Sequence, residues 1–150
     1  MADVKEFSGE YRFLSNFWEA PIEHDFGSWG ILKMRTVEHG YQAMKAINKK
    51  DFLTILQLPT PSEAKKMGRE VKVRKDWDKV KDNVMMRLVR AKFDGNSMLK
   101  DMLVATHPDM LIEGNEWGDT YWGVDKKYGG ENMLGRILMA IRDDYVSEKQ

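Results

Sequence analysis

From Thr36 to the end of this chain, hydrophobic residues recur mostly at the spacing of an α-helix, and this periodicity limits the folds that the chain can adopt. The first 35 residues differ, because they are rich in the aromatic and turn-forming residues of loops with short strands. Strands do not alternate with helices as a doubly wound parallel sheet requires, and the G-x-G-x-x-G and G-K-S/T motifs are absent. The sequence therefore predicts a mostly helical protein with a few short strands, and it argues against Rossmann and phosphate-loop folds.

Capping signals and apolar stripes locate the individual elements. Thr36, Thr60 and Asn96 are expected N-caps, and Thr60 opens a capping box with Pro61 at the first helical position. The expected elements are a hairpin with strands near 17–23 and 29–35, helices at about 36–46, 51–58, 61–70, 77–93, 97–106 and 131–146, and an extended segment at 110–115. The residues expected to face the core are Val80, Val84, Leu88 and Ala91 in the longest helix and Leu134, Ile137, Leu138, Ile141 and Tyr145 in the last.

Length and charge indicate how many domains to expect and which binding partners are disfavoured. A chain of 150 residues is expected to form one domain, residues 1–150, with a hydrophobic core of its own. Its 24 basic side chains balance 24 acidic ones, so no global field draws it to DNA or to an anionic membrane. The N-terminus carries no apolar run, which predicts neither a signal peptide nor a membrane span and favours a cytoplasmic location.

Metal chemistry is not expected from this composition. The absence of cysteine excludes disulfides and thiolate zinc sites. The three histidines, His24, His39 and His107, lie far apart and show no ligand spacing. We therefore expect no metal and no redox cofactor.

The stretch TVEHGYQAMKA places an acid, an amide and an amine along one side of a helix. Each residue turns a helix by about 100°, so Glu38, Gln42 and Lys45 fall within roughly 60° of one another. A solvated face explains this pattern as well as a pocket wall does. In a pocket, the carboxylate could act as an acid or base or stabilise an oxocarbenium ion, and the lysine could form a Schiff base.

The stretch IEGNEWGDTYWG, residues 112–123, combines glycines with flat rings and short polar groups. Trp117 and Trp122 could stack on a base, or they could plug a core. The number of acidic and amide side chains among the rings favours binding. Three further signals are weaker, since each has an ordinary explanation: Asn132 as a helix cap, Ser15 and Asn16 as turn residues, and the basic segment 65–75 as a solvated surface. That segment could otherwise attract phosphates or nucleic acid.

Five blocks in this order, FLSNFW, TVEHGYQAMKA, PSEAKKMGREV, LIEGNEWGDTYWGV and NMLGRILMAIR, resemble the NADAR superfamily of YbiA-like proteins over about residues 7–142. The resemblance implies a compact, predominantly helical α+β domain without a metal or cofactor. It also implies a hydrolase that cleaves N-glycosidic bonds between a ribose and a nitrogenous base. Similar members cleave ribosylamino-pyrimidine phosphates, the early riboflavin intermediates. Others remove ADP-ribose from modified guanine in nucleic acid.

Matched motif by motif, the resemblance implies a set of site residues. For catalysis, the chemistry of breaking a C1–N bond makes Glu38 and Asp119 the candidates for a carboxylate near C1, and Lys45 could instead trap the ring-opened ribose as a Schiff base. Expected substrate-binding residues are Ser15, Asn16, Phe17, His39, Gln42, Glu113, Asn115, Trp117, Trp122, Gly123, Asn132 and Leu134. Gly40 departs from the family pattern, which often has an aromatic after the Glu-His pair. The predicted partner is a small nucleotide-like substrate or ADP-ribosylated nucleic acid, with no membrane. The alternative functions are a non-catalytic sensor of NAD or ADP-ribose, and a protein-interaction module built on the basic segment.

Overall fold

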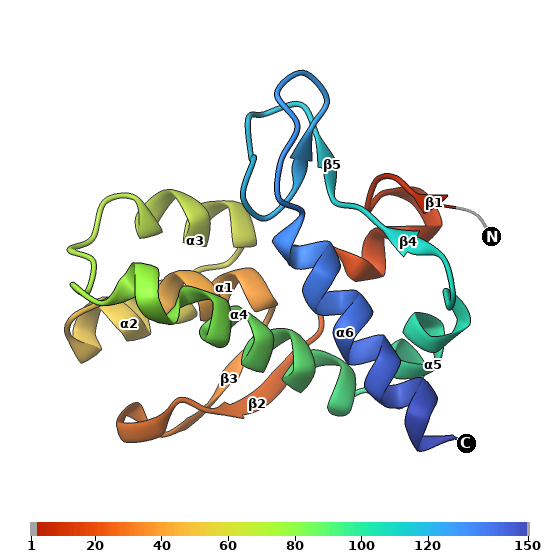
Figure 1. Cartoon of the computed structure of the whole chain (residues 1–150). Coiled ribbons are helices and arrows are strands. Elements are labelled where there is room, and N and C mark those ends of the chain that lie inside the picture. The colour runs from red at the N-terminus through yellow and green to blue at the C-terminus, as the bar shows by residue number, and fades with distance from the viewer. Residues whose placement is uncertain (1–2, 150) are drawn as a thin grey trace. The chain divides into compact units, whose positions relative to one another are not determined.

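The computed structural model describes residues 3–149 and shows a chain dominated by helices (Figure 1). Its few strands are short, so the predicted predominantly helical α+β fold class is confirmed. The described residues form two compact units, one of residues 16–95 and one of residues 3–15 together with 96–149, and each is described here by itself. No helix within residues 3–149 is both long enough and apolar enough to cross a membrane.

Helix α1, Val37–Ala43, is the central element of the first unit (Figure 1). It contacts helix α2, Lys49–Leu56, helix α3, Pro61–Gly68, helix α4, Trp77–Asp94, and strand β3. All seven of its residues are buried, including its charged and amide side chains. A helix that is buried on every side cannot present a solvated face, so the polar groups of α1 need an explanation other than exposure.

A β-hairpin completes this unit. Strand β2, Ile22–Asp25, pairs antiparallel with strand β3, Ile31–Met34, around a short 3-10 turn at Gly27–Trp29. The hairpin was predicted, but its first strand begins later than expected, and its turn is shorter because His24 and Asp25 belong to the strand. The turn fits glycine at both ends, since Gly27 and Gly30 adopt positive φ angles of 73° and 98°.

Helices α1, α3 and α5, Ser97–Ala105, begin where the capping signals predicted, and α2 begins after a cap that was not predicted, Asn48. The side chains of Thr36, Asn48, Thr60 and Asn96 each accept a hydrogen bond from the backbone amide three residues later. Thr60 also donates from its hydroxyl to Glu63, with 3.0 Å between the oxygens. Caps of this kind typically contribute about 1 kcal/mol each. Local signals therefore fix the starts of α1, α2, α3 and α5.

The predicted inner face of the longest helix is wrong. Val80, Val84 and Ala91 are only partly buried in α4, and of the predicted stripe only Leu88 is fully buried. The buried face is instead formed by Trp77, Met85, Leu88, Val89, Lys92 and Phe93. The predicted and the observed buried faces share only Leu88. The observed face is favoured because the bulkier apolar side chains of Met85 and Phe93 bury more area than valine and alanine do.

The second unit is built around helix α6, Met133–Glu148, which contacts helix α5, Ser97–Ala105, and strand β4, Met110–Leu111 (Figure 1). The predicted inner face of α6 is confirmed, because Leu134, Ile137, Leu138, Ile141 and Tyr145 are all buried. Strand β1, Asp3–Val4, pairs parallel with β4, and strand β5, Gly114–Asn115, pairs parallel with strand β6, Val124–Asp125. A 3-10 helix, Gly9–Leu14, follows β1.

Several predicted boundaries need correction, among them the end of the helix expected at 36–46, because α1 ends at Ala43 and Lys45 lies beyond it. The extended segment 110–115 is divided between β4 and β5. Helix α3 ends at Gly68 rather than at about residue 70, and α2 begins at Lys49 because Asn48 caps it. The strands β1 and β6 are two residues long and pair with distant segments, so no local periodicity announces them.

Candidate active site

An acid and an amide meet inside the first unit, on α1. Glu38 is 7% exposed and Gln42 is 5% exposed. The Gln42 Nε2 donates a hydrogen bond to the Glu38 carboxylate, with 3.3 Å between the nitrogen and Oε2. Because burying a charged carboxylate is costly without polar partners, a group placed here points to a function for the site. Of the two interpretations left open by the sequence, the solvated face is excluded for Glu38 and Gln42.

Lys45 follows the end of α1 and is partly buried. Desolvation is the main cause that lowers the pKa of its amine. The charge of Glu38 opposes this effect, whereas the positive charges of Arg69, Lys65 and Lys81 lower the pKa further. Its Nζ lies 5.6 Å from the centre of the Tyr41 ring. A lysine with a lowered pKa has a larger neutral fraction, and the neutral amine is the form that attacks carbonyl and imine carbons.

The S-N-F segment reaches the same helix. The carbonyl of Asn16 accepts a hydrogen bond from the backbone amide of Glu38 at 3.1 Å, and its side-chain amide donates to the sulfur of Met85 at 3.4 Å. The ring of Phe17 is 39% exposed and lies under the Lys65 amine, 5.9 Å from Nζ to the ring centre. Asn16 and Phe17 therefore lie beside α1 and α3, as parts of the same unit.

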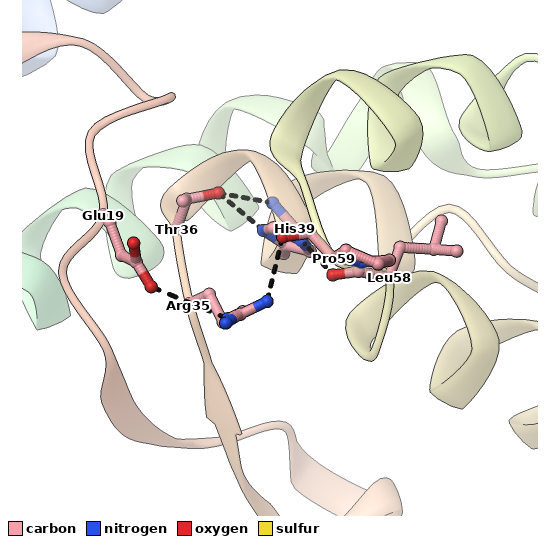
Figure 2. Close-up of polar contacts among 6 residues, drawn as sticks. All are labelled: Glu19, Arg35, Thr36, His39, Leu58 and Pro59. Carbon is pink, nitrogen blue, oxygen red and sulfur yellow. Dashed lines mark hydrogen bonds and ion pairs between the residues drawn. The ribbon is translucent and has the colours of Figure 1, made fainter.

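His39 is bonded to the fold at both ring nitrogens (Figure 2). Its Nε2 lies 2.8 Å from the Leu58 carbonyl, which can only accept, so Nε2 carries the hydrogen. Its Nδ1 lies 2.8 Å from the Thr36 hydroxyl and therefore accepts from it. Burial is the first cause that lowers the pKa of this imidazole, in agreement with a neutral ring. The histidine thus fixes the 58–60 turn against the start of α1.

Arg35 reinforces the same junction (Figure 2). Its Nη1 donates to the Pro59 carbonyl at 2.9 Å, while its Nε lies 3.6 Å from the Glu19 carboxylate. Together with His39, it holds two consecutive carbonyls just before the N-cap of α3. These bonds position α3, and we infer that His39 contributes to the site by positioning rather than by a ring nitrogen facing a ligand.

The departure at Gly40 has a packing explanation. A methyl group at this position would stand 2.8 Å from the Met34 sulfur and 3.0 Å from Cδ2 of Leu88. In this chain the space beside His39 is therefore filled by β3 and α4 side chains instead of by a side chain of α1. An aromatic residue at position 40 would require both neighbours to move.

The tryptophan loop, residues 112–123, belongs to the other unit and is shaped by its own polar side chains. Asn115 Oδ1 accepts from the amides of Trp117 and Asp119 at 3.3 and 3.1 Å, and its Nδ2 donates to the Asp119 carbonyl at 2.9 Å. Asp119 Oδ1 in turn accepts from the amides of Tyr121 and Trp122 at 3.1 and 3.0 Å. Asn115 and one oxygen of Asp119 thus act on the backbone of the loop itself.

Asp125, in β6 just after this loop, has a carboxylate that stabilises the local backbone, and it was not among the predicted site residues. Its carboxylate accepts from the amides of Gly118, Lys127 and Tyr128 at 2.8 to 2.9 Å. These bonds, led by the one from Tyr128, lower its pKa. The signal available in the sequence was an aspartate just before a turn ending in two glycines, a position where an Asp side chain often accepts backbone amides.

Asn132 joins the loop to α6. It adopts a left-handed conformation with φ 54°, donates to the Leu111 carbonyl at 2.9 Å and accepts from the Glu113 amide at 3.0 Å. Asn132 stands at the N-cap position of α6, but its side chain makes no capping hydrogen bond and binds the backbone at Leu111 and Glu113 instead. Leu134 lies in the core of this unit with no exposed surface.

The rings of the loop differ in exposure. Trp117 is 67% exposed, whereas Trp122 is partly buried and packs edge-on against Tyr121 with 4.9 Å between ring centres. Most of the Trp117 side chain is therefore exposed, and Trp122 contributes to the shape of the loop. Gly123 is buried, and a methyl there would collide with the Glu113 carbonyl, so the backbones of the two segments approach closely.

The predicted site residues thus fall into two sets. Asn16, Phe17, Glu38, His39, Gln42 and Lys45 are brought together in the unit of residues 16–95. Ser15, Glu113, Asn115, Trp117, Asp119, Trp122, Gly123, Asn132 and Leu134 belong to the other unit, where Ser15 ends the 3-10 helix. Among residues 3–149, no group of three or more His, Asp or Glu side chains is arranged to hold a metal ion.

Comparison with known proteins agrees with the motif blocks. The NADAR domain model matches residues 4–145. N-glycosidase YbiA of Escherichia coli strain K12 is 38% identical over 144 residues, which cover 95% of this chain and 86% of that protein. The chloroplastic riboflavin biosynthesis protein PYRR of Zea mays is 35% identical over 142 residues, covering 87% of this chain and 23% of that protein.

A solved structure shares the fold. The NMR structure of the E. coli protein YbiA superimposes with a TM-score of 0.84 at 35% sequence identity, covering 99% of this chain and 89% of that one. The resemblance drawn from the five blocks is therefore confirmed. The prediction of a hydrolase of the N-glycosidase class is also confirmed, since the relatives of that name match nearly the whole chain.

Proposed function

The chain belongs to the NADAR domain family, and from this premise we propose that it hydrolyses the bond between C1 of a phosphorylated ribose and an exocyclic or ring nitrogen of a base. The observation that carries the proposal is the buried Glu38 carboxylate, held by Gln42 beside an amine of lowered pKa. Breaking a C1–N bond develops positive charge on the sugar, and a fixed carboxylate stabilises that charge.

Two routes are compatible with this arrangement. In direct hydrolysis, Glu38 stabilises the oxocarbenium ion or takes a proton from the attacking water, and the base leaves with a proton. In the covalent route, the ribosylamine opens to an imine, and the neutral Lys45 amine adds to C1. The base amine then leaves with a proton, an imine remains between Lys45 and the sugar, and water finally releases the sugar as its aldehyde. In the covalent route, Glu38 moves the protons between the amines and water.

The lowering of the Lys45 pKa by its surroundings favours the covalent route. An amine with an unperturbed pKa is almost entirely protonated at neutral pH, and only the neutral amine attacks C1. The neighbouring charges of Arg69, Lys65 and Lys81, together with burial, increase the neutral fraction. The covalent route is therefore the one that we propose.

Cations near Lys45 favour a phosphorylated substrate. Lys65 and Arg69 are one helical turn apart at the end of α3, and both act electrostatically on Lys45. Holding like charges close together is unfavourable, and a phosphate would compensate them. We propose that these two side chains contact the phosphate of the ribose.

Of the two substrate types, we propose the ribosylamino-pyrimidine phosphates. The matched relatives include a protein named for riboflavin biosynthesis, and the overall charge of the chain is balanced rather than basic. ADP-ribosylated guanine in nucleotides or nucleic acid is the second candidate, supported by the basic segment 65–75.

The experiment offers the purified protein a ribosylamino-pyrimidine phosphate and ADP-ribosyl-guanosine in parallel, and measures the free base by chromatography. We expect base release from the pyrimidine substrate and a Lys45 adduct when borohydride is present, seen as a mass increase on the peptide that contains Lys45. Base release without an adduct would support direct hydrolysis. Tight binding without base release would identify a non-catalytic sensor and contradict the proposal.

A further inference from the structure

The last residue of α3 is Gly68, which lies where α3 packs against α1. Gly68 is buried, and a methyl group placed on it would coincide with Oε1 of Gln42. The same methyl would stand 2.8 Å from Cδ of Gln42 and 3.2 Å from its Cβ. The Gln42 amide therefore occupies the space that any other residue at position 68 would fill.

The Gln42 amide is held at one end only. Its Nε2 donates to Glu38, whereas its Oε1 has no hydrogen-bond partner among the described residues and lies against the Cα of Gly68. The opposite orientation of the amide would place an oxygen against the Glu38 carboxylate and is disfavoured. Contact with the Cα–H of a glycine is at most a weak hydrogen bond, so it is the shape of α3 that holds the amide in place.

The position of Gly68 is fixed by the contacts that hold the start of α3. His39 and Arg35 fix the carbonyls of Leu58 and Pro59 just before α3, and Ala64, one turn before Gly68, is fully buried. Since α3 is fixed at its start and closely packed along its length, the space at Gly68 has a defined position relative to α1.

We propose that Gly68 is a positioning residue for the glycosidase reaction: its missing side chain leaves the space in which the Gln42 amide is held against the Glu38 carboxylate. This inference rests on the proposed role of Glu38. Gly68→Ala moves the amide, which is the end of a flexible side chain, and leaves the backbone in place. The helix itself tolerates the change, because alanine is a better helix former than glycine.

The test is a double-mutant cycle of Gly68→Ala and Gln42→Ala. We expect each variant to lose about ten- to a hundredfold in kcat/KM, equivalent to about 1.4 to 2.8 kcal/mol, mainly through kcat. Because Gly68 acts through Gln42, the double variant should be no slower than Gln42→Ala alone. A merely structural effect of the methyl would instead persist in the Gln42→Ala background and overturn the inference.

Gly95 supplies a matched control in the same unit. It caps the end of α4, and a methyl there would coincide with Cδ1 of Ile22, again the end of a flexible side chain. Gly95 is exposed and the methyl would also stand 3.0 Å from the Ala91 carbonyl oxygen. Gly95→Ala therefore displaces a side chain at a more open position away from Glu38 and Gln42, and we expect its activity to be retained. Equal losses in Gly95→Ala and Gly68→Ala would contradict a specific role for Gly68.

A readout that needs no substrate separates this inference from the proposed function. The chain contains three glutamines, Gln42, Gln57 and Gln150, so their side-chain amide signals in a ¹H–¹⁵N spectrum can be assigned by substitution. We expect Gly68→Ala to shift the Gln42 amide signal and to speed its hydrogen exchange, and Gly95→Ala to do neither. An unchanged signal, or a Gly68→Ala protein that fails to fold, would overturn the inference. A wild-type protein without glycosidase activity would instead refute only the proposed function.

Discussion

Lys92, in α4, offers a stability test whose size can be worked out from the structure. Its side chain is 2% exposed, and burial lowers its pKa from 10.5 to about 7. A shift of this size corresponds to an upper limit of about 4 to 5 kcal/mol of unfavourable free energy for the charged form in the folded protein. Lys92→Met keeps the length and apolar stem of the side chain and removes the charge. We expect it to raise the free energy of unfolding at pH 7 on the order of 2 to 4 kcal/mol.

The pH dependence has a definite sign. Between pH 7 and 10.5 the unfolded chain binds a proton at Lys92 that the folded chain does not, so wild-type stability rises with pH in this window. Below about pH 7 both states are protonated and the full penalty is present. From pH 7 to pH 9 the contribution of Lys92 should change by about 2 kcal/mol. The advantage of Lys92→Met should therefore shrink by that amount at pH 9.

The assay is urea unfolding of the wild-type protein and of Lys92→Met at pH 7 and pH 9. Lys79→Met, at an exposed position of the same helix, controls for the loss of a lysine. Because this substitution is at an exposed position, it should change the free energy of unfolding by no more than about 0.5 kcal/mol. If Lys92→Met is no more stable than wild type at pH 7, or if its advantage is the same at both pH values, the reasoning about Lys92 is refuted.

Three further results are expected. His39→Ala should lower the free energy of unfolding by about 1 to 3 kcal/mol in urea titrations, because it leaves the Leu58 carbonyl without its donor; a change near zero would contradict this. Since only the neutral amine of Lys45 attacks C1, kcat should rise with pH through the lowered pKa of Lys45, and a rate that does not change with pH would contradict the covalent route. Asp125→Asn should increase hydrogen exchange at the amides of Gly118, Lys127 and Tyr128, which the carboxylate now binds; unchanged exchange at all three would contradict its structural role.

What the sequence predicted well depends on neighbours within a few residues. Thr36 and Thr60 cap helices through amides three residues later, so their side chains alone indicate where the helices start. The inner face of α6 was predictable because its leucines, isoleucines and tyrosine follow one stripe. In α4 the predicted and the observed apolar stripes share Leu88, and tertiary packing determines which of the two is buried.

The site depends on contacts that are distant in sequence. The partner of His39 is a carbonyl 19 residues away, and a backbone carbonyl leaves no trace in the sequence. The pattern put Gln42 beside Glu38 but gave no sign that Gly68 defines its position. For Asn115, Asp119 and Asn132, the motifs predicted a place in the site, and only the structure showed that their side chains bind the backbone of their own unit.

The central claim is that the buried carboxylate of α1 drives cleavage of a C1–N bond. The most direct measurement compares the rate of base release from a ribosylamino-pyrimidine phosphate by wild type and by Glu38→Gln, with far-UV circular dichroism and the urea midpoint as checks of folding. We expect folded Glu38→Gln to release no base above the rate without enzyme. A folded variant that releases base at the wild-type rate would contradict the account.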